Sequence, residues 1–344
     1  MNTTAKLGPT LSKKLYERIL IIGAGSVGKR HAVNFANLGY SVDCADPRED
    51  RRIEFLQLPE TQQGFTDLQT ALASRRMYKG VIVCSPPVFH VEQSALCLDA
   101  GIPVFLEKPV APDLSSALRL RESLSRSSVP LLLGYTWRWW PALKFFRRMV
   151  RENQLGKNYF ARFNISAHLA DWHPWEDYRE FFMSSKELGG GALLDESHWI
   201  DQMVWLFGFP KSVSGVVDKL TNLDITSDDF VEFVARYDDN LTVSVHLDIF
   251  GRPHEKSMVV IGEKGRISWT EESNCVSWLD SSGVVQEKKF QEERNAMFVG
   301  AAEEFSSLIL SKSISTCTLS DGIQVLKIIE AIRQSSELGK IVNI

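Results

Sequence analysis

The sequence predicts an α/β domain on a parallel sheet, followed by an α+β domain built on a large, mainly antiparallel sheet. Three observations predict this. The chain has 344 residues, enough for two cores. Short apolar strands alternate with helical stretches in its first part, and strands with an in-out alternation dominate the second part. We therefore expect a loose polar tail at 1–17, a first domain at 18–134 and a second at 135–344.

Composition excludes several classes of protein. With 44% hydrophobic and 24% charged residues, the chain is neither disordered nor fibrous. A net charge of -4 gives no electrostatic footprint for nucleic acid or an anionic membrane. Five widely spaced cysteines without a CxxC pair favour a reduced, cytoplasmic setting. No apolar run approaches the ~20 residues of a membrane span, and the first residues lack the apolar core of a signal peptide.

The first domain opens with a turn typical of dinucleotide sites. A buried strand at Ile19–Ile22 runs into a glycine-rich turn and then into a helix that ends at Leu38. The first glycine allows a tight turn, the second lets the backbone approach a pyrophosphate, and the third lets helix pack on strand. The expected contacts are Gly23, Gly25, Ser26, Val27 and Gly28. Strand, glycines and helix together predict a Rossmann domain.

The acid after the second strand favours NAD. Asp46 follows the strand Ser41–Ala45 and is suited to accept from a ribose 2'-hydroxyl, which would also repel a 2'-phosphate. Arg48 and Arg51 lie close by and keep NADP possible.

The alternation of strands and helices continues to residue 134. The expected elements are Leu68–Ala73 (helix), Val81–Cys84 (strand), His90–Ala100 (helix), Val104–Leu106 (strand), Asp113–Arg126 (helix) and Leu131–Leu133 (strand). Ligands bind outside the carboxyl ends of parallel strands. The further cofactor contacts predicted at this edge are Arg48, Ser85, Pro86, His90, Glu107 and Lys108.

The second domain reads as a sheet with few helices. The expected strands are Tyr159–Ala167, Val213–Val217, Phe230–Tyr237, Leu241–Ile249, Met258–Ile261, Arg266–Thr270, Cys275–Leu279 and Val284–Phe290. A glycine triplet introduces an expected helix, Ala192–Phe207. On that helix Asp195, His198 and Asp201 recur every three residues and share a face, so a carboxylate can hold the imidazole of His198.

Four segments carry a resemblance to a known family. GAGSVGKRH, CSPPVFHVEQSALCLDAGIPVFLEKP, GYTWRWWPAL and GGGALLDESHWIDQMVWLFG resemble, in order and spacing, the glucose-fructose oxidoreductase / inositol dehydrogenase / MocA family. The resemblance covers nearly the whole chain from residue 18. It implies an NAD(P)-dependent oxidoreductase that acts on sugars, polyols or their derivatives, and a homodimer or homotetramer.

The resemblance also implies roles for three residues. Lys108 matches the family's lysine near the nicotinamide, His198 its acid/base histidine and Asp195 the aspartate partner. Many members have four residues from aspartate to histidine, whereas here there are three, so Glu196 is an alternative partner. Oxidation of a secondary alcohol removes a hydride and a proton. We expect Lys108, with a pKa lowered beside the nicotinamide, to polarise the hydroxyl oxygen while His198 accepts the proton.

A polar, aromatic segment at 168–179 predicts a substrate-binding wall, because aromatic faces stack on sugar rings and charged groups bind hydroxyls or phosphates. Seven of the nine tryptophans lie between 137 and 205. The expected substrate contacts are Trp172, Trp175, Tyr178, Arg179, Arg138 and Lys186. The alternative is that the two tryptophans only pin the loop to the sheet. His168 and His173 lack a third ligand at regular spacing, so we expect no metal.

The segments DWHPWEDYR and KELGGG also resemble a branch associated with bacterial surface-sugar biosynthesis, which implies a nucleotide-linked or acidic sugar. Two alternatives remain open: a redox-neutral NAD-dependent glycosidase and a non-catalytic, NAD-responsive regulator.

Overall fold

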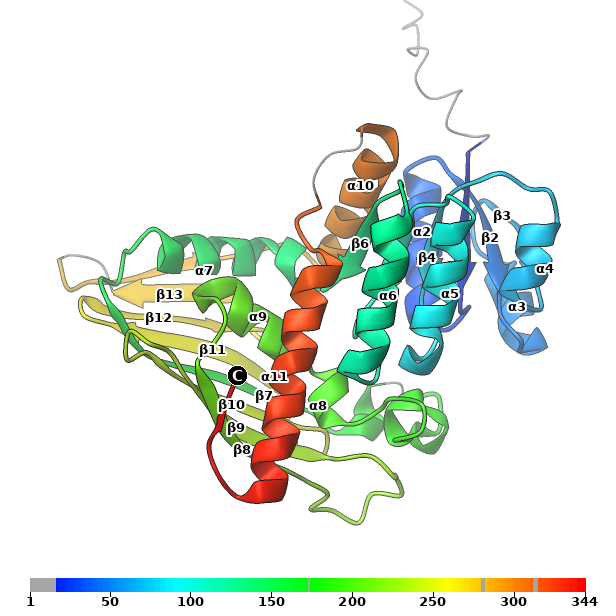
Figure 1. Ribbon diagram of the computed structural model, residues 1–344. Helices are drawn as coiled ribbons and strands as arrows, with labels where there is room; N and C mark the ends of the chain where they lie inside the picture. The colour runs from blue at the N-terminus through cyan, green and yellow to red at the C-terminus, as the bar shows by residue number, and fades with distance from the viewer. Residues whose placement is uncertain (1–16, 173, 280–281, 312–314) are drawn as a thin grey trace, which may run out of the picture.

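The computed structural model describes residues 17–172, 174–279, 282–311 and 315–344, and it contains two sheets, each covered by helices (Figure 1). Of the predicted tail, only Glu17 lies within the described residues. The predicted fold class is confirmed: a parallel sheet comes first and a larger, mostly antiparallel sheet follows.

The first sheet has six parallel strands in the order β3-β2-β1-β4-β5-β6. The strands are β1 (Arg18–Ile22), β2 (Ser41–Ala45), β3 (Thr61–Phe65), β4 (Tyr78–Val83), β5 (Val104–Glu107) and β6 (Leu131–Gly134). The strand order reverses between β1 and β4, which is where such sheets bind ligands. A ligand is therefore expected at the turns after these two strands.

The helices of this part are α2 (Ser26–Asn37), α3 (Glu49–Phe55), α4 (Leu68–Ala73), α5 (Pro87–Asp99) and α6 (Leu114–Arg126). Every predicted strand and helix of the first domain is present, with ends shifted by up to three residues. The sequence analysis missed α3 and β3. Strand β3 lies at the sheet edge and reads TQQGF, so it lacks the apolar run that identifies a buried strand.

The second sheet has nine strands in the order β14-β13-β12-β11-β7-β10-β9-β8-β15. They are β7 (Asn158–Ser166), β8 (Ser212–Asp218), β9 (Phe230–Arg236), β10 (Thr242–Asp248), β11 (Glu255–Gly262), β12 (Gly265–Thr270), β13 (Cys275–Leu279), β14 (Val285–Lys289) and β15 (Val342–Asn343). Both predicted hairpins, β9–β10 and β11–β12, are present. The pair β7–β10 is parallel. Helices α7 (Pro141–Arg151), α9 (His198–Phe207) and α11 (Leu319–Leu338) lie along one side of this sheet (Figure 1).

Helix α10 (Ala296–Ser311) returns to the first sheet, although the sequence analysis assigned all of 135–344 to the second domain. It stands beside α2 and β6 in Figure 1. Its Phe305 ring lies 6.1 Å from that of Phe35 and 5.8 Å from that of Phe105. A Cβ on Gly80 would come within 2.7 Å of Phe305. The absence of a side chain at this position of β4 therefore allows α10 to pack closely against the sheet. The two parts of the chain thus share one core.

The predicted single helix Ala192–Phe207 is wrong. The structure has a short helix α8 (Ala192–Asp195), a turn at Glu196 and Ser197, and then α9. The amides of Ser197 and Trp199 donate to carbonyls three residues back, which tightens the chain at this point. The spacing of three therefore does not place Asp195 and His198 on one regular helical face.

Candidate functional site

The glycine turn after β1 has the geometry that a dinucleotide requires. Gly23 has φ +92°, and a Cβ there would stand 2.7 Å from the carbonyl oxygen of Cys84. A Cβ on Gly28 would stand 1.9 Å from the carbonyl oxygen of Gly23, so only glycine lets α2 approach the turn. A Cβ added at Gly25 would meet no atom closer than a guanidinium nitrogen of Arg51, at 3.6 Å. The backbone at Gly25 is therefore open to a phosphate, while Gly23 and Gly28 close the turn behind it.

Asp46 ties the end of β2 to this turn. Its carboxylate accepts hydrogen bonds from the amides of Ala24, at 2.7 Å, and Arg48, at 2.9 Å. The Arg48 guanidinium pairs with Asp50. Ser26 and Val27 are exposed on the first turn of α2. The donor set at the helix N-terminus and the buried acid beside it fit an NAD ribose and pyrophosphate.

Two predicted cofactor contacts, His90 and Glu107, are buried and bind other parts of the protein. His90 is 1% exposed, and its ring nitrogens lie 2.7 Å from the carbonyl oxygens of Pro109 and Ser85, so it bridges the turns after β4 and β5. Glu107 lies 2.7 Å from the buried His31 of α2. Burial lowers the pKa of His90, while the hydrogen bonds to the two carbonyl oxygens act in the opposite direction. Both side chains hold the edge of the cleft in place and turn their polar atoms inward.

Lys108 follows β5 and reaches the second half of the chain. Its Nζ donates to the backbone oxygen of Asp195 at 2.7 Å and to the carboxylate of Asp195 at 3.1 Å. Burial would lower the pKa of Lys108, but the carboxylates of Asp195 and Glu196 outweigh it and raise the pKa. These carboxylates keep the ammonium charged, and the lowering expected beside a cationic nicotinamide stays a prediction.

His198 is held by aromatic rings. Its ring stacks on Trp137 with centroids 5.0 Å apart and planes 8° apart, and Tyr135 meets it edge-on at 5.7 Å. Its Nδ1 is buried and has no hydrogen-bond partner among the described residues. The predicted Asp195–His198 pairing is wrong, because Asp195 binds Lys108. Burial, with the charges of Lys108 and Lys256, holds the pKa of His198 well below its usual value.

Two charged residues of the site, Lys256 and Arg294, were not predicted from the sequence, and Glu196 was predicted only as an alternative partner of His198. Glu196 is 6% exposed; burial, and then repulsion by Asp195, raise its pKa to about 7. Lys256 of β11 pairs with Glu271 at 2.9 Å and lies 5.7 Å from the Trp137 ring centroid. Arg294 acts electrostatically on both Glu196 and His198. Lys256 could have been recognised as a lysine on the buried face of a strand, but the predicted strand began two residues later, at Met258.

Arg138 is not a substrate contact. It is 5% exposed, pairs with the fully buried Asp201 at 2.6 Å and Asp321 at 3.1 Å, and donates to the Thr316 carbonyl oxygen at 3.0 Å. The N–H groups of its guanidinium therefore already donate to acceptors of the protein. Asp201 likewise serves this ion pair and does not assist His198.

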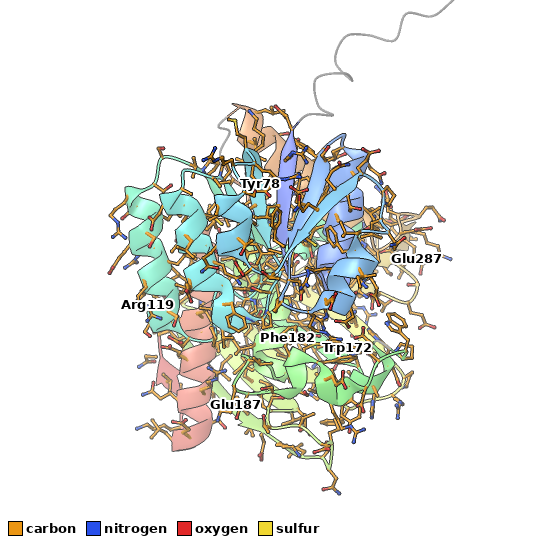
Figure 2. All side chains as sticks on the ribbon, turned by 90° about the vertical axis from the view of Figure 1, so that its right-hand side faces the viewer. Tyr78, Arg119, Trp172, Phe182, Glu187 and Glu287 are labelled. Atoms are coloured by element: carbon orange, nitrogen blue, oxygen red, sulfur yellow. The ribbon has the colours of Figure 1, made fainter. Side chains whose placement is uncertain are left out.

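The segment after β7 holds the remaining predicted substrate contacts; Figure 2 marks Trp172 and Phe182 within it. Trp172 is partly buried against the core. The Tyr178 hydroxyl accepts from the Asp224 amide at 3.3 Å, and Arg179 pairs with Asp177. Lys186 is exposed. These four remain predicted substrate contacts.

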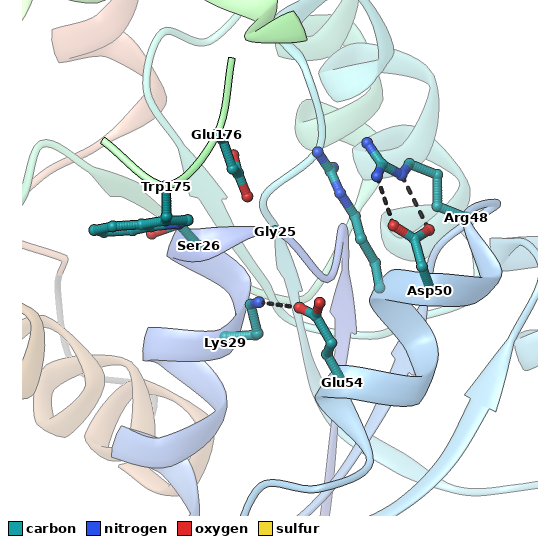
Figure 3. Close-up of a pocket in the computed structure, with 9 residues that line it drawn as sticks. Gly25, Ser26, Lys29, Arg48, Asp50, Glu54, Trp175 and Glu176 are labelled. Carbon is teal, nitrogen blue, oxygen red and sulfur yellow. Dashed lines mark hydrogen bonds and ion pairs between the residues drawn. The ribbon is translucent and has the colours of Figure 1, made fainter. Parts of the chain in front are cut away.

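Trp175 lies elsewhere than predicted. Together with Glu176 it lines a cleft of about 290 Å³ whose other walls come from the dinucleotide part of the molecule (Figure 3). Those walls are Gly25, Ser26, Lys29, Arg48, Asp50, Arg51 and Glu54. Trp175 thus belongs to the phosphate end of the cleft, across the glycine turn.

Over the described ranges no group of three or more His, Cys, Asp and Glu side chains is arranged to hold a metal ion; His173 lies outside these residues. Nor does any helix in the described part of the chain have the length and apolar character to span a bilayer.

Family models identify the chain. The model described as "Oxidoreductase family, NAD-binding Rossmann fold" matches residues 17–135, and the "GFO/IDH/MocA C-terminal domain" matches 144–268. Together they cover more than half of the chain. The protein belongs to the Gfo/Idh/MocA oxidoreductase family. Its first domain is therefore an NAD-binding Rossmann domain.

Curated Gfo/Idh/MocA relatives are similar at modest identity. The chain is 29% identical to the rhizopine catabolism protein MocA of Rhizobium meliloti over 56% of this chain and 57% of that protein. It is 22% identical to glucose-6-phosphate 3-dehydrogenase of Bacillus subtilis over 91% of this chain and 95% of that protein. The first relatives are matched over only about half of their own length.

Solved structures share the fold over nearly the whole chain. GenD2 from gentamicin A biosynthesis, in complex with NAD, has a TM-score of 0.82 and 19% identity, covering 95% of this chain and 96% of that one. WlbA dehydrogenase from Bordetella pertussis, in complex with NADH and UDP-GlcNAcA, has a TM-score of 0.79 and 20% identity, covering 95% and 98%.

Proposed function

We propose that this protein is an NAD-dependent dehydrogenase that oxidises a secondary hydroxyl of a sugar or sugar derivative, or reduces the corresponding ketone. The observation that carries the proposal is the meeting of Lys108 with Asp195 and His198 at the edge of the dinucleotide cleft. The nicotinamide, when bound, takes up or gives the hydride. The protein must supply orientation and a path for the proton.

Lys108 orients the substrate oxygen. The carboxylates of Asp195 and Glu196 raise its pKa and favour the ammonium, which polarises the hydroxyl or carbonyl oxygen as a hydrogen-bond donor. Asp195 holds the ammonium in position by two hydrogen bonds, one through its backbone oxygen. Asp195 therefore acts on Lys108, which makes it a positioning residue.

His198 handles the proton. The lowered pKa keeps the imidazole neutral, so a ring lone pair is available to the hydroxyl proton. Nδ1 is buried, which leaves Nε2 as the nitrogen that meets the substrate. Stacking on Trp137 fixes the ring plane, which replaces the carboxylate partner that the sequence analysis expected.

The proposed substrate class rests on the charge of Arg294 and on the names of related proteins. A sugar or polyol is supported by relatives named inositol 2-dehydrogenase and glucose-6-phosphate 3-dehydrogenase. An acidic or nucleotide-linked sugar is supported by Arg294, which is exposed and whose charge reaches Glu196 and His198. An anionic substituent would offset this cation.

We further propose a cytoplasmic homodimer or homotetramer. All five cysteines are free, as suits a reducing compartment. Val216 of the second sheet is 48% exposed, and a second copy would cover it.

Two variants test the proposal. Lys108→Met and His198→Ala should each lower kcat about 10²- to 10⁴-fold, the usual contribution of a positioned proton-handling group, while the Kd for NADH changes little. Steady-state rates with a sugar panel and NADH fluorescence titration give the two numbers. A variant with near-normal kcat would remove that residue from the mechanism.

A further inference from the structure

Trp175 is unusual among the large aromatic side chains of this protein. It is 73% exposed, although tryptophan is highly buried on average. It does not lie on an apolar patch, because the cleft that it lines is made mainly of charged side chains and glycine backbone (Figure 3). The exposure of the indole and the polar lining of the cleft together distinguish Trp175 from the tryptophans of the core.

The walls of the cleft identify which part of a dinucleotide would fill it. Gly25 and Ser26 form the N-terminus of α2, a helix of 12 residues, where phosphates bind. Arg48 and Arg51 follow Asp46, the acid at the ribose position. The cleft therefore faces the ADP half of the cofactor, whereas Lys108 marks the opposite, nicotinamide end.

Most charges in this cleft are already matched. Lys29 pairs with Glu54 at 2.7 Å, and Arg48 pairs with Asp50 (Figure 3). Trp175 provides the large flat surface on the facing side. Indole faces stack on purine rings and on arginine guanidinium planes.

We propose that Trp175 is a cofactor-binding residue that closes over the ADP half of NAD from the second part of the chain. It stacks on the adenosine as the dinucleotide lies along the glycine turn. This inference rests on the proposed function, because it requires the cofactor, and it reassigns Trp175 from substrate to cofactor. Binding of NAD thereby joins the segment after β7 to the Rossmann domain before any substrate enters.

ADP-ribose tests this directly, since it lacks the nicotinamide and needs no turnover. Calorimetric titration of Trp175→Ala should give a Kd about tenfold higher than that of the wild type. Trp175→Phe retains an aromatic face and should recover most of the affinity. Trp205→Phe is the matched control, because Trp205 lies on α9, stacked on Arg147, outside the cleft. The high exposure of Trp175 means that its replacement should leave the Tm unchanged.

Acrylamide quenching of tryptophan fluorescence gives a second readout. ADP-ribose should protect part of the emission of the wild type and of Trp205→Phe, and this protection should vanish in Trp175→Phe. Equal affinity for ADP-ribose in the wild type and Trp175→Ala, or unchanged protection in Trp175→Phe, would overturn the inference alone. If neither ADP-ribose nor NADH binds the wild type, both the inference and the proposed function fail.

Discussion

Glu196 differs from the other acids of the site because no cation bonds directly to its carboxylate in the described structure, while Asp195 beside it binds Lys108. Its pKa is raised to about 7 by burial and by the Asp195 charge. The unfolded chain loses this proton near the ordinary value of about 4.3, whereas the folded chain keeps it until about pH 7. Stability therefore falls as pH rises through this window.

Glu196→Gln should remove that fall. We expect the variant and the wild type to have similar Tm values near pH 4, and the variant to have the higher Tm at pH 8. Scanning calorimetry across the window measures the difference, with the exposed Glu292→Gln as control. Parallel Tm curves for the wild type and Glu196→Gln would show that Glu196 ionises normally.

At this scale the sequence predicted identities better than partners. The roles of Lys108, Asp195 and His198 were predicted from the family resemblance; in the structure Asp195 binds Lys108, and the charge of Lys108 acts on His198. The pairing was wrong because it assumed a continuous helix, whereas the turn at Glu196 sends Asp195 toward Lys108. Arg294 lies in a polar segment before α10 and offers no local pattern, so its place in the site depends on the tertiary fold.

The turn between β1 and α2 is the element that most directly prepares cofactor binding, and its glycines have different roles. Gly25 has φ -73°, which an alanine can adopt, and a methyl group there would enter the cleft. At Gly28 it would collide with the turn itself. Gly25→Ala should therefore keep its Tm and lose NADH affinity, whereas Gly28→Ala should lose several degrees of Tm.

Thermal melts and NADH titrations of both variants separate the two roles. Full NADH affinity in Gly25→Ala would contradict the placement of the pyrophosphate. The sequence predicted this element well because strand, turn and helix are local. It predicted β3 poorly because an edge strand need not be apolar.

On the scale of the whole molecule, Arg138 links distant parts of the chain. It lies in the 3-10 helix Thr136–Trp139 and binds Asp201 of α9 and Asp321 of α11. Arg138→Met leaves Asp201 buried and unpaired, and removal of one partner of a buried pair costs about 3–5 kcal/mol. Urea unfolding should show this loss, and Arg138→Met/Asp201→Leu should recover part of it. A loss below about 1 kcal/mol would contradict this role.

Such links explain why whole-molecule features were the hardest to predict. Neither the return of α10 to the first sheet nor the seating of Phe305 on Gly80 leaves a trace in local periodicity. The same applies to Trp175. The polar, aromatic composition of the segment 168–179 predicted a ligand contact, but only the fold shows that Trp175 faces the glycine turn.

The activity proposed for this protein is net hydride transfer between a sugar-type alcohol and NAD. The most direct measurement incubates the wild type with NAD and a panel of neutral, phosphorylated, acidic and nucleotide-linked sugars, and quantifies NADH and carbonyl product together. We predict equimolar NADH and ketone for at least one sugar, and loss of both in Lys108→Met. Sugar cleavage without net NADH, or NAD binding without any product across the panel, would contradict the claim.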